Sequence, residues 1–342
     1  MFTLNYNEYD AHVYETELKD FLPDAFIDIH THIWKNTFTP YGASNGGATW
    51  THLVADEQTA EDLLGALKTL YPGKTVTPLV FGGVDQDVRQ CNDYVAETAA
   101  KYHYPTLLRT DYSMTADEVE REVARCGCIG LKPYLTNCPP YIPNGEIRIF
   151  DFLPHEHLEL ANRHGWIVML HIARAMRLRD PVNVAQLMEI ERLYPNVKLI
   201  VAHIGRAYSK QDIGDAFETL RHTEHMLFDF TANLCDDAIR ACIEAVGTKR
   251  LMFGSDLPIC NMRMYRITDP VTGFYKNVVP RGLYGDVSGD AHMQESDEKT
   301  ITLMIYEQLR AFRRVAKELH LSDRQVEEIM YTNSKNLIDS MK

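Results

Sequence analysis

Short, nearly continuous apolar runs alternate with amphipathic segments along most of the chain. The apolar runs predict strands at residues 26–32, 76–81, 104–109, 129–134, 166–171, 198–203, 226–230 and 250–256. Helical spacing of apolar residues occupies residues 59–71, 85–101, 115–126, 151–164, 181–194, 212–222 and 236–246. Strands that are apolar on both faces are typical of parallel sheets covered by helices. Eight such units predict an α/β fold, a (β/α)8 TIM barrel.

An open doubly wound sheet fits this pattern less well, because no glycine-rich dinucleotide fingerprint opens a helix. We expect a single domain over residues 1–342, with a barrel core at 26–256. A polar N-terminal extension precedes the core, and a helix at 9–20 is expected in it. A long insertion at 257–298 follows strand eight, and closing helices occupy 299–342. The insertion is long enough to cover the barrel mouth or to contact a second subunit in a homodimer.

Composition excludes several classes of function. The formal charge of −13 argues against a nucleic-acid binder, which presents a basic face. The longest apolar runs are strand-sized, so we expect no membrane span, and the first ten residues do not resemble a signal peptide. Seven scattered cysteines without a Cys-x-x-Cys pair suit a reducing cytoplasm, which is the expected location.

Strong ligand residues stand at the ends of the predicted strands. These are His30 and His32 on strand one, Lys132 on strand four, His171 on strand five, His203 on strand six and Asp256 on strand eight. Side chains two apart on a strand point the same way, so His30 and His32 form a pair. The C-terminal strand ends of a (β/α)8 barrel share the face that holds the active site. Imidazole and carboxylate groups converging there predict a divalent metal site.

The motifs at these strand ends resemble those of a known family. They are His30-Thr31-His32, Gly130-Leu131-Lys132, Leu170-His171, Val201-Ala202-His203-Ile204-Gly205 and Phe253-Gly254-Ser255-Asp256. In order and spacing they are similar to the amidohydrolase superfamily, and most of all to its "amidohydrolase 2" branch with the aminocarboxymuconate semialdehyde decarboxylase relatives. The resemblance spans roughly residues 25–340.

The resemblance implies a role for each residue. His30, His32, His171 and Asp256 would bind one divalent metal, with zinc expected first and manganese or iron as alternatives. Asp256 would also take the proton of the attacking water. His203 would act as general acid/base or, in a binuclear site, as a ligand of the second metal.

Lys132 has three interpretations. In binuclear relatives a lysine on strand four is carboxylated and bridges two metals. In the mononuclear branch resembled here the equivalent position contacts substrate, which is the interpretation we favour. The third is a structural lysine paired with a neighbouring carboxylate.

Arginines gather just after the strand ends, which on an acidic protein predicts an anionic small-molecule substrate. Arg174 and Arg206 are the leading candidates, since each stands three residues after a site histidine. The alternative is that most of these arginines pair with Asp180, Asp212 or Asp269 at the rim.

Three functions remain open at the level of sequence. The first is a metal-dependent hydrolase that uses activated water on an amide, lactone or related bond. The second is a non-oxidative decarboxylase of an unsaturated or aromatic carboxylic acid at the same metal site. The third is a catalytically inactive barrel that serves as a binding protein. Ser-His-Asp hydrolysis is poorly supported, because the chain has no Gly-x-Ser-x-Gly elbow.

Overall fold

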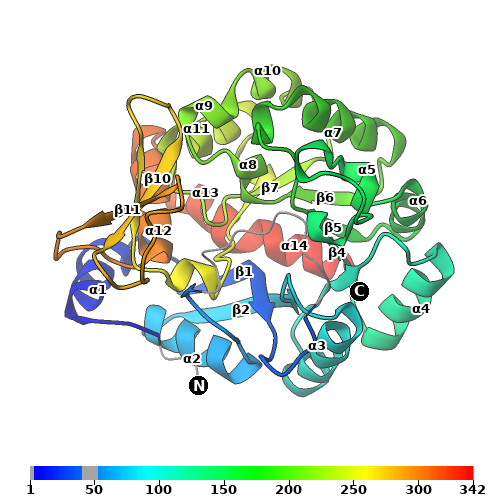
Figure 1. The fold of residues 1–342 in the computed structure, drawn as a ribbon, viewed down its shortest axis with the longest axis horizontal. Helices are drawn as coiled ribbons and strands as arrows, with labels where there is room; N and C mark the ends of the chain where they lie inside the picture. The colour runs from blue at the N-terminus through cyan, green and yellow to red at the C-terminus, as the bar shows by residue number, and fades with distance from the viewer. Residues whose placement is uncertain (1–3, 41–52, 342) are drawn as a thin grey trace.

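The strands form a closed parallel barrel. The computed structural model describes residues 4–40 and 53–341 (Figure 1). Its barrel strands are β1 (Ala25–Ile33), β2 (Thr75–Gly82), β3 (Leu108–Thr110), β4 (Gly130–Pro133), β5 (Ile167–Leu170), β6 (Lys198–Val201), β7 (Leu227–Asp229) and β8 (Leu251–Met252). β1 pairs with β2, and β3 to β8 form a six-stranded sheet in sequence order. Every one of these pairings is parallel.

Backbone hydrogen bonds join the two sheets at both seams. At one seam the Val80 amide donates to Pro105 O at 3.0 Å and Leu107 N donates to Val80 O at 3.2 Å. At the other, His32 N donates to Leu257 O at 2.9 Å and Ile29 N donates to Phe253 O at 3.1 Å. The ring is therefore complete, and the predicted (β/α)8 barrel is confirmed.

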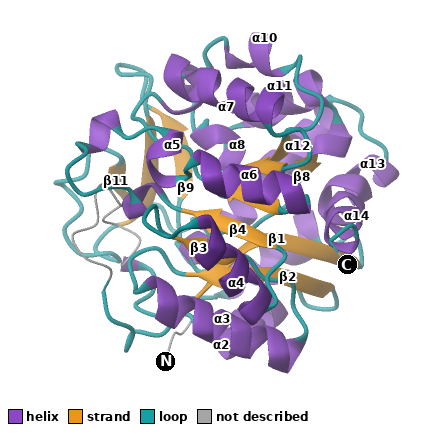
Figure 2. Cartoon of the chain, turned by 90° about the vertical axis from the view of Figure 1, so that its right-hand side faces the viewer, coloured by secondary structure: helices purple, strands orange, loops and turns teal. Residues whose placement is uncertain are grey.

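Helices surround the strands, as Figure 2 shows. They are α2 (Ala60–Leu70), α3 (Val88–Tyr102), α4 (Ala116–Cys126), α5 (Ile149–Phe152), α6 (His155–His164), α7 (Pro181–Leu193), α9 (Lys210–Ile213), α10 (Ala216–Leu220) and α11 (Asp236–Val246). The helix expected at 212–222 is wrong in one respect, because it is split into α9 and α10. Gly214, with φ 53° and ψ −135°, lies between them in a conformation that a helix cannot contain.

Two layers of apolar side chains lie on either side of the strands. The inner layer fills the barrel and includes Ile27, Leu79, Ile167 and Ile200, with Leu337 and Ile338 packed against it. The last two belong to α14 (Asn333–Asp339), which follows α12 (Met304–Glu318), α13 (Asp323–Glu327) and a π-helical turn at Glu328–Thr332. The outer layer lies between the strands and the helices.

A bulge in β1 turns its last residues toward the barrel mouth. Asp28 pairs with Pro78, but the next partners are Thr31 and Val80, so β1 contains one extra residue there. Ile27 and Ile29 belong to the inner layer before the bulge. Because a one-residue shift reverses which side chains face inward, His30 and His32 face inward after it. The inward direction of the predicted histidine pair depends on this extra residue.

The insertion forms a small sheet of its own. β10 (Tyr275–Pro280) lies between β9 (Tyr265–Thr268), to which it is antiparallel, and β11 (Met293–Ser296), to which it is parallel. This sheet lies beside α12 and above α1 (Glu8–Val13) of the N-terminal extension (Figure 1). The helix expected at 9–20 exists as α1 and a π-helical turn at Tyr14–Leu18. Within the described ranges, no helix combines the length and apolar character needed to cross a membrane.

Candidate active site

The strand ends enclose a cavity of about 210 Å³. His30, His32, His171, His203 and Asp256 all line it, and so do Lys132 and Arg206. Arg174 does not line it. The sequence analysis thus identified residues from β1, β4, β5, β6 and the end of β8 that the fold brings to one place.

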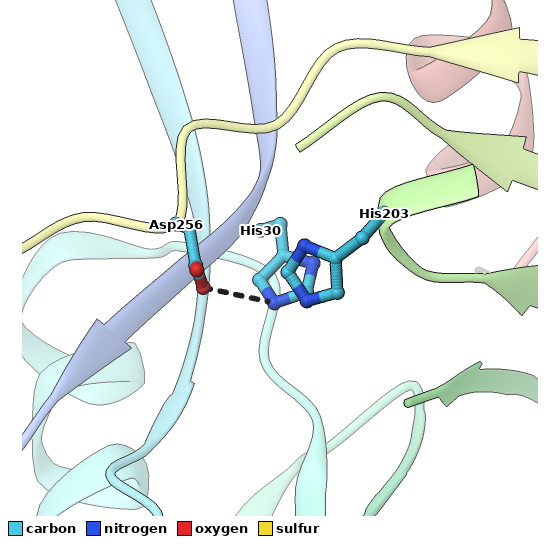
Figure 3. A group of neighbouring side chains, drawn as sticks. All are labelled: His30, His203 and Asp256. Carbon is cyan, nitrogen blue, oxygen red and sulfur yellow. Dashed lines mark ion pairs between the residues drawn. The ribbon is translucent and has the colours of Figure 1, made fainter. Parts of the chain in front are cut away.

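His30 lies at the centre of the cluster. Its Nδ1 is 3.1 Å from Oδ2 of Asp229, so this nitrogen carries the proton and donates it to the carboxylate. Its Nε2 is 3.4 Å from Oδ1 of Asp256 and 3.5 Å from Nζ of Lys132. The imidazole is therefore oriented with an unprotonated nitrogen toward the cavity (Figure 3).

His32 shares the same carboxylate. Its Nε2 is 2.9 Å from Oδ1 of Asp256, and its Nδ1 is 3.1 Å from the hydroxyl of Tyr134. The Tyr134 hydroxyl also lies 3.3 Å from the carbonyl oxygen of Gly82. The Tyr134 hydroxyl can therefore donate to Gly82 O while it accepts a hydrogen bond from Nδ1 of His32. In that tautomer Nε2 of His32 would offer its lone pair to a metal, whereas in the other tautomer Nε2 donates to Asp256 across the 2.9 Å contact.

His203 and His171 complete the cluster from β6 and β5. Nδ1 of His203 is 2.9 Å from Thr231 O, which leaves its Nε2 free to face the cavity. The ligand atoms of His30, His203 and Asp256 all lie within 4.8 Å of one another (Figure 3). The His171 ring centroid is 5.2 Å from that of His203, and among the described residues its Nδ1 has no hydrogen-bond partner. The structure thus brings His203 close enough to be a ligand, and the assignment of His171 as a ligand and His203 as acid/base stays a prediction.

A left-handed turn directs two of these side chains. His203, Ile204, Gly205 and Arg206 all have positive φ angles between 49° and 60°, in the short element α8 (His203–Arg206). Such backbone costs roughly 1–2 kcal/mol for each residue other than glycine. Asp229 accepts from the His203 amide at 2.7 Å, and Nδ2 of Asn233 donates to the carbonyl oxygens of His203 and Ala207. These bonds hold the strained turn that points His203 and Arg206 into the cavity.

Burial sets the charge of the site. It lowers the pKa of His30 and His171 well below the usual value, with nearby Lys132 and Arg206 contributing. Burial also lowers the pKa of His203. For Asp256 burial acts to raise the pKa, but the hydrogen bond from His32 and the surrounding histidines bring it to about 2. At neutral pH the site therefore combines the neutral imidazoles of His30, His171 and His203 with an ionised carboxylate.

These groups fit a divalent cation. Neutral imidazole nitrogen and carboxylate oxygen are ligands of zinc, manganese and iron. Asp229 and Thr231 O each accept a hydrogen bond from the Nδ1 of a histidine and so fix its tautomer, as is usual around bound metals.

Lys132 is buried beside these groups. Burial lowers the pKa of Lys132 to about 8, partly opposed by Asp229 and Asp256. Its ammonium lies 4.8 Å from the Phe81 ring and 5.1 Å from the Tyr134 ring.

The two predicted arginines have different surroundings. Arg206 donates from Nη1 to Ile172 O and Arg174 O and faces the cavity. Arg174 instead pairs with Asp180, 3.0 Å from Nε. The rim pairing considered as the alternative thus describes Arg174, whose contact with substrate stays a prediction.

Several residues of the site escaped the sequence analysis. Asp229 ends β7, and the same strand-end criterion could have found it. Tyr134 lies just beyond β4, two residues after Lys132, so the same criterion could have found it as well. Tyr208, Arg266 and Tyr275 line the cavity from the loop after α8 and from the insertion, where no motif distinguishes them.

Known structures share this fold over nearly the whole chain. An amidohydrolase from Burkholderia multivorans with bound zinc matches with a TM-score of 0.60 at 14% identity, covering 92% of this chain and 99% of that chain. A probable 2-pyrone-4,6-dicarboxylic acid hydrolase from Acinetobacter baumannii, with citric acid bound, gives 0.57 at 13% identity, with coverage of 92% and 99%. A dihydroxybenzoic acid decarboxylase from Polaromonas sp. JS666, with manganese and the inhibitor 2-nitroresorcinol, gives 0.54 at 13% identity, with coverage of 94% and 98%.

Identities this low show likeness of fold alone. No curated protein sequence matches the chain at a significant level. The family model described as amidohydrolase, of the amidohydrolase 2 type, matches residues 27–269, which is most of the chain and contains every predicted ligand residue. The chain belongs to this amidohydrolase family of metal-dependent enzymes.

Proposed function

We propose that this protein is a metal-dependent hydrolase that cleaves an amide, lactone or related bond in a small anionic molecule. The observation that carries the proposal is the ionised carboxylate of Asp256, held 2.9 Å from His32 and 3.4 Å from His30 at the cavity wall. A carboxylate in this place can accept the proton of an attacking water.

His30, His32, His171 and Asp256 are the residues that we propose hold one divalent metal, with zinc first. Such a metal lowers the pKa of water and polarises the substrate oxygen. In this scheme Asp256 takes the proton from the water and passes it to the leaving group. The neutral His203, anchored through Nδ1, orients the water or the developing oxyanion with Nε2. Lys132 and Arg206 bind the anionic part of the substrate.

Non-oxidative decarboxylation is the second candidate. Lys132 and Arg206 face the same cavity and suit a reacting carboxylate as well as a remote one. His203 or Asp256 would then move a proton to the carbon that loses CO₂. A dihydroxybenzoic acid decarboxylase shares the fold of this chain.

Isotope incorporation separates the two reactions. The purified, metal-loaded protein is assayed against lactones, amides and aromatic carboxylic acids in ¹⁸O-labelled water and, in parallel, in D₂O. A hydrolase places one ¹⁸O atom in the new carboxylate. A decarboxylase releases CO₂ and leaves solvent deuterium on carbon, which would replace the first proposal by the second.

Matched variants test the assigned chemistry. Asp256→Asn should abolish turnover while most of the metal stays bound, and Asp20→Asn, which changes an exposed carboxylate, should act as wild type. Metal analysis of wild type and His30→Ala should give one equivalent that is lost in the variant. Two equivalents would indicate a carboxylated Lys132 between two metals, and bound metal without turnover of any substrate would favour the inactive barrel.

A further inference from the structure

Most arginines around the barrel mouth have a carboxylate partner. Arg174 pairs with Asp180 at 3.0 Å, Arg177 with Asp212 at 2.8 Å, and Arg263 with Asp10 at 2.6 Å. None of these three arginines lines the cavity. They are structural ion pairs of the kind that hold loops in place.

Arg206 and Arg266 differ from them in both respects. Both line the cavity, and neither forms an ion pair within residues 4–40 and 53–341. Among the described residues, the Arg206 guanidinium bonds only to two carbonyl oxygens, both from Nη1. Arg266 donates from Nε to Asn277 Oδ1 at 2.9 Å and from Nη1 to Ala232 O at 3.0 Å. Each guanidinium therefore keeps N–H donors that a planar anion could accept.

Two tyrosines hold the Arg266 guanidinium at one wall of the cavity. The carbon of the Arg266 guanidinium is 4.7 Å from the ring centroids of both Tyr208 and Tyr275. The two rings meet edge to face at 5.3 Å, and both line the cavity. Arg206 lines the same cavity as these two tyrosines. The aromatic contacts fix the Arg266 guanidinium without neutralising it.

The charges of the cavity wall are unbalanced. Lys132, Arg206 and Arg266 face the cavity with only Asp85 and Asp256 as acidic neighbours in the lining. Asp256 already accepts from His32, and a divalent metal would add further positive charge. A positive charge without a counter-charge in a partly desolvated wall is unfavourable unless a ligand supplies the negative charge. This excess of positive charge therefore favours a substrate with more than one negative charge.

We propose, building on the function proposed above, that Arg206 and Arg266 form a subsite for a carboxylate of the substrate that does not react. Under hydrolysis the substrate is then a carboxylic acid that also contains the amide, lactone or related bond. Under decarboxylation it is a dicarboxylic acid. The insertion supplies Arg266 from β9 and Tyr275 from β10, so it is a wall of the active site rather than a remote appendage.

Binding to the metal-free protein tests the subsite without turnover. Benzoate and its neutral isostere benzamide are titrated by calorimetry into chelator-treated wild type and variants. We expect benzoate to bind at least about tenfold more tightly than benzamide, since charge-assisted bonds to guanidinium are strong. Arg206→Gln and Arg266→Gln should each remove about tenfold or more of the benzoate affinity. The exposed Arg281→Gln should retain it.

Several results would overturn the subsite. Equal affinity for benzoate and benzamide, or an unchanged benzoate affinity in both arginine variants, would rule out the subsite. Loss of affinity in Lys132→Met alone would transfer carboxylate binding to Lys132, and tighter binding of inorganic phosphate would assign the wall to a phosphoryl group. If a glutamine variant fails to fold, Arg206→Lys and Arg266→Lys keep the charge and should still weaken binding, because the planar fork is lost. Isotope incorporation and metal content test the proposed function separately, so the subsite and the proposed function can fail independently of each other.

Discussion

Asp229 connects two parts of the site at the scale of a single residue. One carboxylate oxygen accepts from His30 Nδ1 and the other from the amide of His203. In Asp229→Asn the amide group cannot provide the same charged acceptor for His30. We expect metal affinity to fall by roughly 10- to 100-fold, the usual effect of removing a partner that orients a metal-binding histidine. Competition against a chromophoric chelator measures it, with Asp20→Asn as the control; an unchanged affinity would exclude the orienting role.

Lys132 makes the stability of the metal-free protein depend on pH. Burial lowers its pKa from 10.5 to about 8, so between these values the unfolded chain binds more protons than the folded one. Stability should therefore rise with pH from 8 to 10.5, and the full penalty, on the order of 3 kcal/mol, applies below pH 8. Lys132→Met should raise the melting temperature at pH 7 and lose this advantage by pH 10.

The control for Lys132 is the exposed Lys299→Met, which should leave the profile unchanged. Both are measured with chelator present. If Lys132→Met melts lower than wild type at pH 7, the ammonium stabilises the fold and the structural interpretation of Lys132 gains support.

At the scale of the element, the left-handed turn α8 shows what local sequence does not reveal. Ile204 is β-branched, and its φ of 49° and ψ of 48° are unfavourable for such a residue. Gly205 tolerates the conformation, and a Cβ there would approach Leu178 to 2.5 Å. Hydrogen bonds from Asp229, at the end of β7, and from Asn233 after it help to hold the turn. Strained backbone of this kind is typical of functional sites.

Asn233 is the residue that we expect to maintain this turn. Its buried Nδ2 bonds to His203 O at 3.2 Å and to Ala207 O at 3.0 Å. Asn233→Ala should lower the free energy of unfolding by about 1–3 kcal/mol, because two buried carbonyls lose a donor. It should also weaken benzoate binding through displacement of Arg206. Urea unfolding and calorimetry measure the two effects, with the exposed Asn144→Ala as control. Loss of stability with full benzoate affinity would limit Asn233 to a structural role.

The bulge in β1 is a second feature that the local sequence does not reveal. Strict alternation from Ile27 and Ile29 would direct Thr31 inward and His30 outward. The motif placed both histidines correctly, although the physical cause is the extra residue between Asp28 and Thr31. Strand-internal pattern alone does not locate such an insertion, because it is defined by pairing with β2. β8 is also shorter than expected, since beyond Met252 the chain bonds to β1 and not to β7.

At the scale of the whole molecule, the barrel could be predicted because the same sequence pattern recurs in every strand–helix unit. Every strand–helix unit has its own apolar run and amphipathic helix, and parallel strands place their C-terminal ends on one face. Topology therefore brings to one face the strand ends that carry His30, His171, His203 and Asp256. Arg266 could not be assigned in this way, because its place depends on how the small sheet of the insertion packs on the barrel.

One buried ion pair joins the segments that lie outside the barrel. Arg263 of the insertion donates to Asp10 of α1 from Nη1 at 3.0 Å and from Nη2 at 2.6 Å. Asp10 also accepts from the hydroxyl of Thr302, just before α12, at 2.6 Å. Three segments distant in sequence therefore meet at one carboxylate that is fully shielded from solvent.

A double-mutant cycle tests whether this contact fixes the insertion against the barrel. Asp10→Asn or Arg263→Met alone leaves a buried group without its partner and should cost about 3–5 kcal/mol. The double variant removes both charges, so it should lose less than the sum of the single changes by more than about 1 kcal/mol. Urea unfolding gives the free energies, and additive losses would show that the two residues act independently. Because Arg266 and Tyr275 belong to the same insertion, each single variant should also weaken benzoate binding, which would connect the N-terminal extension to the substrate wall.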